Sequence, residues 1–111
     1  MRRLPHVRRI VLSSLSACPN HGYGVIGWAA SLFPNEPRMS IGSVYGAIEA
    51  LENDELIELH EERIQQGRKR RVMRITSRGM TVLQAELRLL QREIETSTIV
   101  SYPTPFGEVS G

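Results

Sequence analysis

Apolar residues recur every three or four positions in four stretches of the chain, and this spacing predicts four helices. The first stretch covers residues 4–17, the second runs from about Tyr23 to Phe33, the third follows Ser40, and the last follows Thr76 and runs to about Thr96. Ser40 and Thr76 suit helix N-caps, because their side-chain oxygens accept hydrogen bonds from unpaired backbone N–H groups. Proline-containing breaks separate the first three helices.

A β-hairpin is predicted between the third and fourth helices. Leu56 to Ile64 forms one strand and Arg70 to Ile75 the returning strand. Gln65–Gln66–Gly67 forms the turn, since glycine takes a positive φ without steric cost. The order of three helices, a hairpin and a long helix is that of a winged helix-turn-helix. In such a module the third helix enters the major groove of DNA and the hairpin, the wing, lies along the backbone.

The predicted fold class is therefore mainly α with a small β-hairpin. We expect a winged helix-turn-helix DNA-binding domain over residues 1–76 and a long C-terminal dimerisation helix over residues 77–98. Residues 99–111 contain two prolines and little periodicity, so they are expected to form a flexible tail. The length of 111 residues fits one such domain with a modest core.

Composition narrows the class of protein. No apolar run approaches the roughly 18 residues that a membrane span requires, so no membrane partner is expected. A single cysteine, Cys18, excludes an internal disulfide and favours a reducing, cytoplasmic setting. The chain shows no Ser-His-Asp set, paired carboxylates or phosphate-cradling glycine loop, which argues against an enzyme and against a cofactor. Cys18 and His21 have a C-x-x-H spacing, but no second pair of ligands follows, so no metal site is expected.

Charge is segregated along the chain although the net charge is only +2. Two clusters, at residues 2–9 and 63–78, hold eleven of the fourteen basic residues, and the second cluster contains no acidic residue. Most acidic residues lie between positions 49 and 62. Segregation of this kind predicts a positively charged surface. The alternative is an ordinary solvated surface on which these charges form salt bridges.

The predicted third helix has an apolar side and a side of small residues. Val44, Ile48 and Leu51 form the apolar side. The opposite side carries Gly42, Ser43, Gly46, Ala47 and Ala50. Each glycine costs about 1 kcal/mol of helix stability relative to alanine, so two of them suggest that close approach to a partner matters there. That partner is either the edge of DNA bases, which Ser43 can hydrogen-bond, or another helix. Tyr45 either anchors a phosphate or belongs to the core with a solvated hydroxyl.

The second basic cluster places four consecutive cations, residues 68–71, in the predicted wing. Arginine stays charged and pairs with phosphate in a bidentate manner, so the DNA backbone is the expected counterpart. The candidate DNA contacts are Arg38, Ser40, Ser43, Tyr45, Gly46, Arg68, Lys69 and Arg70.

The last helix carries a heptad stripe that predicts a homodimer. The candidate dimerisation residues are Met80, Leu83, Leu87, Leu90 and Ile94, spaced by three and four positions. The alternative is an intramolecular core stripe, but the helix is longer than a small domain needs. Trp28 lies at the edge of the second helix's apolar stripe, where it either caps the core or contacts a ligand or partner.

Three motifs, in the same order along the chain, resemble those of the PadR-type regulators. His21–Gly22–Tyr23 resembles the H-G-Y motif that opens the second helix of the family. The segment Ser40 to Tyr45 is similar to the G-T-L-Y recognition segment, and residues 67–79 resemble the wing and its L-T-x-x-G junction. The resemblance spans roughly residues 4–95.

The resemblance implies a homodimeric transcription factor, usually a repressor, that small phenolic or drug-like molecules release from DNA. Any effector would bind between subunits, because the chain has a single C-terminal helix. The sequence departs from the family at Glu55, where glycine is usual, so Asn53 or Asp54 is expected to support the turn. Val72–Met73 replaces a frequent aromatic pair, and Ser43 replaces a common threonine.

We therefore expect a sequence-specific regulator, a repressor by resemblance, that binds double-stranded DNA at an inverted-repeat operator. One alternative is a winged-helix module that binds another protein, although the charged wing argues against it. A second alternative is a carrier that binds small molecules in the dimer cleft, and only Trp28 supports it.

Overall fold

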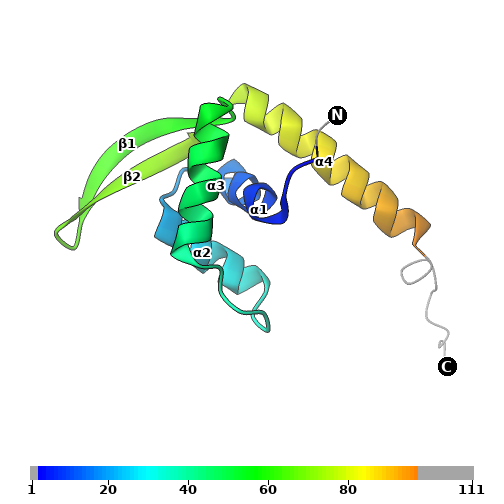
Figure 1. Ribbon diagram of the computed structural model, residues 1–111, viewed down its shortest axis with the longest axis horizontal. Helices are drawn as coiled ribbons and strands as arrows, with labels where there is room; N and C mark the ends of the chain where they lie inside the picture. Colours follow the sequence, from blue (N-terminus) through cyan, green and yellow to red (C-terminus); the bar gives the residue numbers. More distant parts are fainter. Residues whose placement is uncertain (1–2, 98–111) are drawn as a thin grey trace.

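The structure is a computed structural model that describes residues 3–97. It contains α1 (His6–Ala17), α2 (Gly22–Leu32), α3 (Ile41–Asn53), β1 (Ile57–Gln65), β2 (Arg68–Ile75) and α4 (Ser77–Thr96). The first three helices form the body of the molecule, and the hairpin and α4 project from it in opposite directions (Figure 1). This arrangement confirms the predicted fold class. The expected flexible tail lies outside the described residues.

The hairpin is longer than the sequence pattern indicated. β1 and β2 pair antiparallel, and the register runs from Ile57 opposite Ile75 to Gln65 opposite Arg68. Only two residues form the turn, Gln66 with φ 54° and Gly67 with φ 76°. Two consecutive positive φ values are typical of the type I′ turn, whose twist matches that of a hairpin. A bulge between Leu59 and Glu61 shifts the register on one strand.

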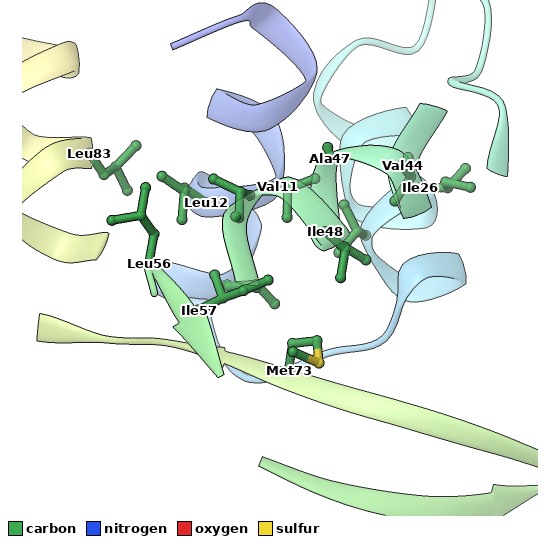
Figure 2. Packing of buried hydrophobic residues seen from close by; sticks show 13 residues of the cluster. Val11, Leu12, Ile26, Val44, Ala47, Ile48, Leu56, Ile57, Met73 and Leu83 are labelled. Atoms are coloured by element: carbon green, nitrogen blue, oxygen red, sulfur yellow. The ribbon is translucent and has the colours of Figure 1, made fainter. Parts of the chain in front are cut away.

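One hydrophobic core joins the helices to the base of the hairpin (Figure 2). Its buried members are Val11, Leu12, Leu15, Val25, Ile26, Val44, Ala47, Ile48, Leu51, Leu56, Ile57, Met73 and Leu83. The prediction that Ala47 lies on the exposed side of α3 is wrong, because only 6% of it is exposed. Positions 44, 47, 48 and 51 together make the apolar face of a helix, so Ala47 packs with its neighbours on that face.

Both predicted N-caps are confirmed. The Ser40 hydroxyl accepts from the Ser43 N–H at 3.1 Å, and the Thr76 hydroxyl accepts from the Gly79 N–H at 3.0 Å. Gly79 is required for space, because a Cβ atom there would lie 2.1 Å from the backbone oxygen of Leu56. The start of α4 is thus fixed directly against the turn between α3 and β1.

That turn is supported by Glu55 and not by Asn53 or Asp54, so the sequence-based expectation is wrong. Glu55 itself has φ 63°, the left-handed conformation that glycine adopts more cheaply. The Leu56 N–H donates to the Leu51 oxygen at 2.9 Å, and the Thr76 hydroxyl donates to the Glu55 oxygen at 2.9 Å. These two hydrogen bonds hold the strained residue in place.

The heptad stripe of α4 is divided between two environments. Leu83 is 2% exposed and points toward Leu12 and Leu56 in the core, so its assignment to a dimer contact is wrong (Figure 2). Leu87 and Ile94 are 42% and 46% exposed. Met80 and Leu90 are partly buried. Within residues 3–97, no helix combines the length and apolar character that a membrane span needs.

Candidate nucleic-acid interface

The exposed side of α3 is open to a partner. Gly42, Ser43 and Gly46 are all exposed, and a Cβ atom added at either glycine would meet nothing within 4 Å. Neither glycine therefore serves to pack α3 against another helix of the described chain. Ser43 accepts from the Ser40 hydroxyl at 2.9 Å and remains exposed, so its hydroxyl proton can be donated outward. Arg38, in the loop before α3, is exposed as well.

Tyr45 stands at the border between α3 and α2. Tyr45 is 45% exposed, so it is not a core residue. A Cβ atom at Gly22 would come within 3.1 Å of the ring, which shows how closely the start of α2 approaches it. The Tyr23 ring meets the Tyr45 ring edge-on, with the centroids 6.5 Å apart. The two tyrosines therefore form one surface across the helix-turn-helix.

Arg70 extends this aromatic surface to the wing. Its guanidinium carbon lies 4.8 Å from the centre of the Tyr23 ring, within the range of a cation–π contact. Its Nε atom is buried and has no hydrogen-bond partner among the described residues. Sequence analysis placed Arg70 in the interface but missed Tyr23. The H-G-Y motif was the available signal, yet it did not indicate that the tyrosine meets the wing.

The start of α2 is attached to the base of the wing. Asn20 and Met73 form an antiparallel bridge, with backbone N–O distances of 3.0 and 2.8 Å. The next residue, His21, caps α2, and its Nδ1 accepts from the Gly24 N–H at 3.2 Å. Partial burial lowers the pKa of His21, and the positive charges of Arg70 and Arg63 lower it further. His21 is thus held neutral at pH 7, with the proton on Nε2.

Most wing cations are already paired with carboxylates, as the alternative interpretation of the charge pattern required. Their pairs are Lys69–Glu62 (3.5 Å), Arg71–Glu52 (3.0 Å), Arg74–Glu58 (2.7 Å) and Arg63–Glu61. At the start of α4, Arg78 pairs with Glu55 (3.9 Å). Arg68 and Arg70 have no ion-pair partner among residues 3–97. The uncompensated positive charge of the wing is therefore concentrated at its tip and above Tyr23.

Trp28 and Cys18 lie outside this surface. Trp28 is partly buried but does not belong to the core cluster, so the interpretation that it caps the core gains no support. Cys18 is exposed. In the described part of the chain, no three His, Cys, Asp or Glu side chains are grouped so that they could hold a metal ion.

The three-helix body with its basic hairpin and capped α3 defines a winged helix-turn-helix protein. Residues 11–85 match the model of the transcriptional regulator PadR-like family, and the chain belongs to that family. No curated protein matches the chain.

Solved structures share the fold at low sequence identity. A transcriptional regulator from Clostridium thermocellum is 21% identical with a TM-score of 0.65, over 84% of this chain and 90% of that one. A PadR family transcription regulator from Clostridium difficile is 19% identical with a TM-score of 0.62, over 82% and 96%. A putative transcriptional regulator from Thermoplasma acidophilum is 21% identical with a TM-score of 0.63, over 80% and 85%.

The lowered pKa of His21 predicts a loss of stability in mild acid. The unfolded chain takes up a proton near pH 6.5, whereas the folded protein does so only at lower pH. The free energy of unfolding should therefore fall as the pH drops from about 7 through the lowered pKa. His21→Asn keeps a capping side chain without a titrating group, so its stability should fall less over this range. Denaturant titrations of both proteins at several pH values measure this, and equal slopes would contradict it.

Proposed function

We propose that the protein is a homodimeric regulator that binds double-stranded DNA in a sequence-specific manner at an inverted repeat. The observation that carries this proposal is that one module combines an open small-residue face on α3 with two wing arginines, Arg68 and Arg70, that have no carboxylate partner within the described residues. The family supplies the class, transcriptional regulators. In the proposed complex, α3 enters the major groove and the wing follows the phosphate backbone.

The exposed face of α3 suits base readout. Gly42 and Gly46 let the helix backbone approach the base edges, because no side chain keeps them apart. Ser43 is exposed between them and can hydrogen-bond either a base or a phosphate. Arg38 and Ser40 precede the helix and are exposed, and in the proposed complex they contact the DNA backbone.

The aromatic and cationic groups beside α3 suit phosphate contact. Arg70 is held over Tyr23, and its Nε–H has no acceptor in the described part of the chain, so a phosphate oxygen would supply one. Arg68 lies at the tip and has no carboxylate partner among residues 3–97. Lys69 contributes only if it leaves Glu62, which is an exposed and weak ion pair.

We also propose that the protein represses transcription and that a small aromatic molecule releases it from DNA, as the family resemblance implies. An open groove of about 580 Å³ lies within one subunit, between the N-terminal segment and α4, and its volume suits a small ligand, so an effector site need not lie between subunits as the resemblance implied. Arg8, Leu56 and Val82 are among its lining residues. A cytoplasmic location is part of the same proposal.

The dimer rests on the outer half of the α4 stripe. Leu87 and Ile94 lie seven positions apart on a helix that projects beyond the body of the protein (Figure 1). A leucine or isoleucine moved out of water is worth about 1.5–3 kcal/mol. Pairing two such helices would bury both stripes and place two copies of α3 in a fixed relation. Two-fold symmetry then calls for an inverted-repeat operator.

Selection of bound duplexes from a random pool tests sequence-specific binding, and it should return an inverted repeat. On the selected duplex, Gly46→Glu should lose at least about a hundredfold in affinity, because a carboxylate facing DNA meets like charge. The matched control Gln84→Glu adds the same charge on an exposed position of α4 and should bind as the wild type does. Normal binding by Gly46→Glu in a gel-shift assay would show that this face does not contact DNA.

The division of wing cations into paired and unpaired groups predicts different salt dependences for two arginine variants. Arg68→Ala should flatten the plot of log affinity against log salt by about 1.8 for a dimer, since each phosphate contact contributes about 0.9. Arg74→Ala removes an arginine paired with Glu58 and should change the slope much less. Fluorescence anisotropy over a range of salt concentrations measures both slopes. Equal slopes for the two variants would refute the assigned role of Arg68.

Replacing the exposed stripe of α4 with carboxylates should abolish the dimer. Leu87→Asp with Ile94→Asp should give a folded monomer that has lost tight operator binding, because neither residue belongs to the core cluster. Gln84→Asp with Gln91→Asp adds two carboxylates with the same spacing on exposed polar positions of α4 and should stay dimeric. Sedimentation at micromolar concentration measures all three proteins. A wild type that sediments as a monomer would overturn the proposed assembly.

A further inference from the structure

A carboxylate is buried in the middle of α4. Glu86 is 5% exposed, and the other buried polar residue of the described chain is the uncharged Ser14. A buried charge costs free energy unless hydrogen bonds and an opposite charge compensate it. The partners of Glu86 therefore show what this residue holds in place.

Within residues 3–97, all hydrogen-bond partners of the Glu86 carboxylate come from the segment before α1. Arg3 donates from Nε to both oxygens at 3.1 and 3.0 Å and from Nη2 at 2.8 Å. The Leu4 N–H donates to the same carboxylate at 3.4 Å. Arg3 also lowers the pKa of Glu86, so the carboxylate stays ionised at neutral pH. We call this contact between residues 3–4 and Glu86 the N-terminal clasp.

The clasp has a stiff connection to the body of the protein. Pro5 follows Leu4 directly and is the N-cap of α1, and its ring restricts the backbone there. The Pro5 oxygen accepts from the Arg9 N–H at 3.0 Å, so the segment continues into the first turn of α1 without a flexible joint. Leu4 packs against the core. In Figure 1 the N-terminal segment runs from the start of α1 to the side of α4.

Three contacts along α4 then set its direction. The first is at Gly79, where the helix lies against the Leu56 carbonyl, the second is Leu83 in the core, and the third, farthest along the helix, is the clasp. Seven positions separate Gly79 from Glu86, which is about 10 Å along a helix axis. From position 91 to position 96 the helix is exposed, so no packing against the rest of residues 3–97 orients it. A small tilt at the clasp is therefore enlarged toward the end of the helix.

We propose that the N-terminal clasp positions α4 and thereby sets the distance and rotation between the two recognition helices of the dimer. This inference rests on the proposed function, since it needs a dimer that reads two half-sites. Arg3 and Glu86 are positioning residues that touch no DNA. They act through α4 on which half-site spacing the dimer accepts. One added base pair rotates the second half-site by about 35°, so a rigid α4 pair discriminates strongly between spacings.

Spacing selectivity tests the clasp. Glu86→Gln is nearly isosteric but lacks the charge that Arg3 and the Leu4 N–H satisfy. The matched control is Glu95→Gln, which removes an exposed carboxylate whose hydrogen bond, from Gln91, stays within α4. Affinity is measured for the selected operator, for operators longer or shorter by one base pair, and for a single half-site.

We expect the wild type and Glu95→Gln to prefer the correct spacing by about tenfold or more, and Glu86→Gln by less than about threefold. Affinity for the single half-site should be the same in all three proteins. Full spacing preference in Glu86→Gln would overturn the proposal. A parallel loss of affinity for every duplex would also overturn it, because that is the pattern of a merely destabilised protein.

Arg3→Ala provides a second route if Glu86→Gln does not fold. Arg3 is about half exposed, so its loss leaves the core intact, and the variant should show the same relaxed spacing. The double variant should show the same spacing preference as either single variant, because each substitution removes the same contact between Arg3 and Glu86. Additive effects would show that the two residues act separately.

A measurement without DNA separates failure of the clasp from failure of the proposed function. A spin label placed by Glu49→Cys in a Cys18→Ser background reports the distance between the two copies of α3. The wild type should give one narrow distribution and Glu86→Gln a broad one. An absence of any intersubunit distance in the wild type would refute the proposed dimer, whereas equally narrow distributions would refute the clasp alone.

Discussion

Helix α3 is held along one face only, and the interface depends on this constraint. Val44, Ala47, Ile48 and Leu51 bury that face in the core shared by the helices and the hairpin base. Because these contacts suffice to hold the helix, its opposite face can carry glycines that contribute nothing to packing. A helix held from both sides could not present its backbone to a groove. In this helix of thirteen residues, one side thus stabilises the fold and the other is free for recognition.

The elements were predictable from sequence because their signals are local. Ser40 and Thr76 cap the helices that follow them, and the apolar period of each helix is visible within a few turns. Ala47 was misplaced because a small residue beside an apolar stripe fits either side of a helix. Leu83 was misplaced because a heptad pattern does not distinguish a partner's helix from the core of the same chain. Only tertiary packing decides on which side of α3 Ala47 lies and whether Leu83 contacts the core or a partner helix.

The contacts that shape the candidate site were the least predictable. Arg3 and Glu86 are 83 positions apart, and nothing in either segment indicates the other. The wing ion pairs depend on strand register, which the bulge near Leu59 alters. The sequence shows seven cations in residues 63–78, yet the structure leaves only Arg68 and Arg70 without a carboxylate partner among residues 3–97. Counting charges therefore overstates the positive field of this surface.

Through the bridge between Asn20 and Met73, the loop before α2 pairs with β2 as a short third strand of the wing. It divides the hairpin into a base anchored by backbone hydrogen bonds and a tip from which the Arg70 and Arg71 side chains reach α2 and α3. For a protein that binds DNA as proposed, this division bears on the kinetics of encounter. The charged tip would meet the phosphate field first, while the anchored base already holds α2 and α3 in their bound orientation. The search along nonspecific DNA would then be made by a preformed reading head, with little ordering left to slow the final docking step.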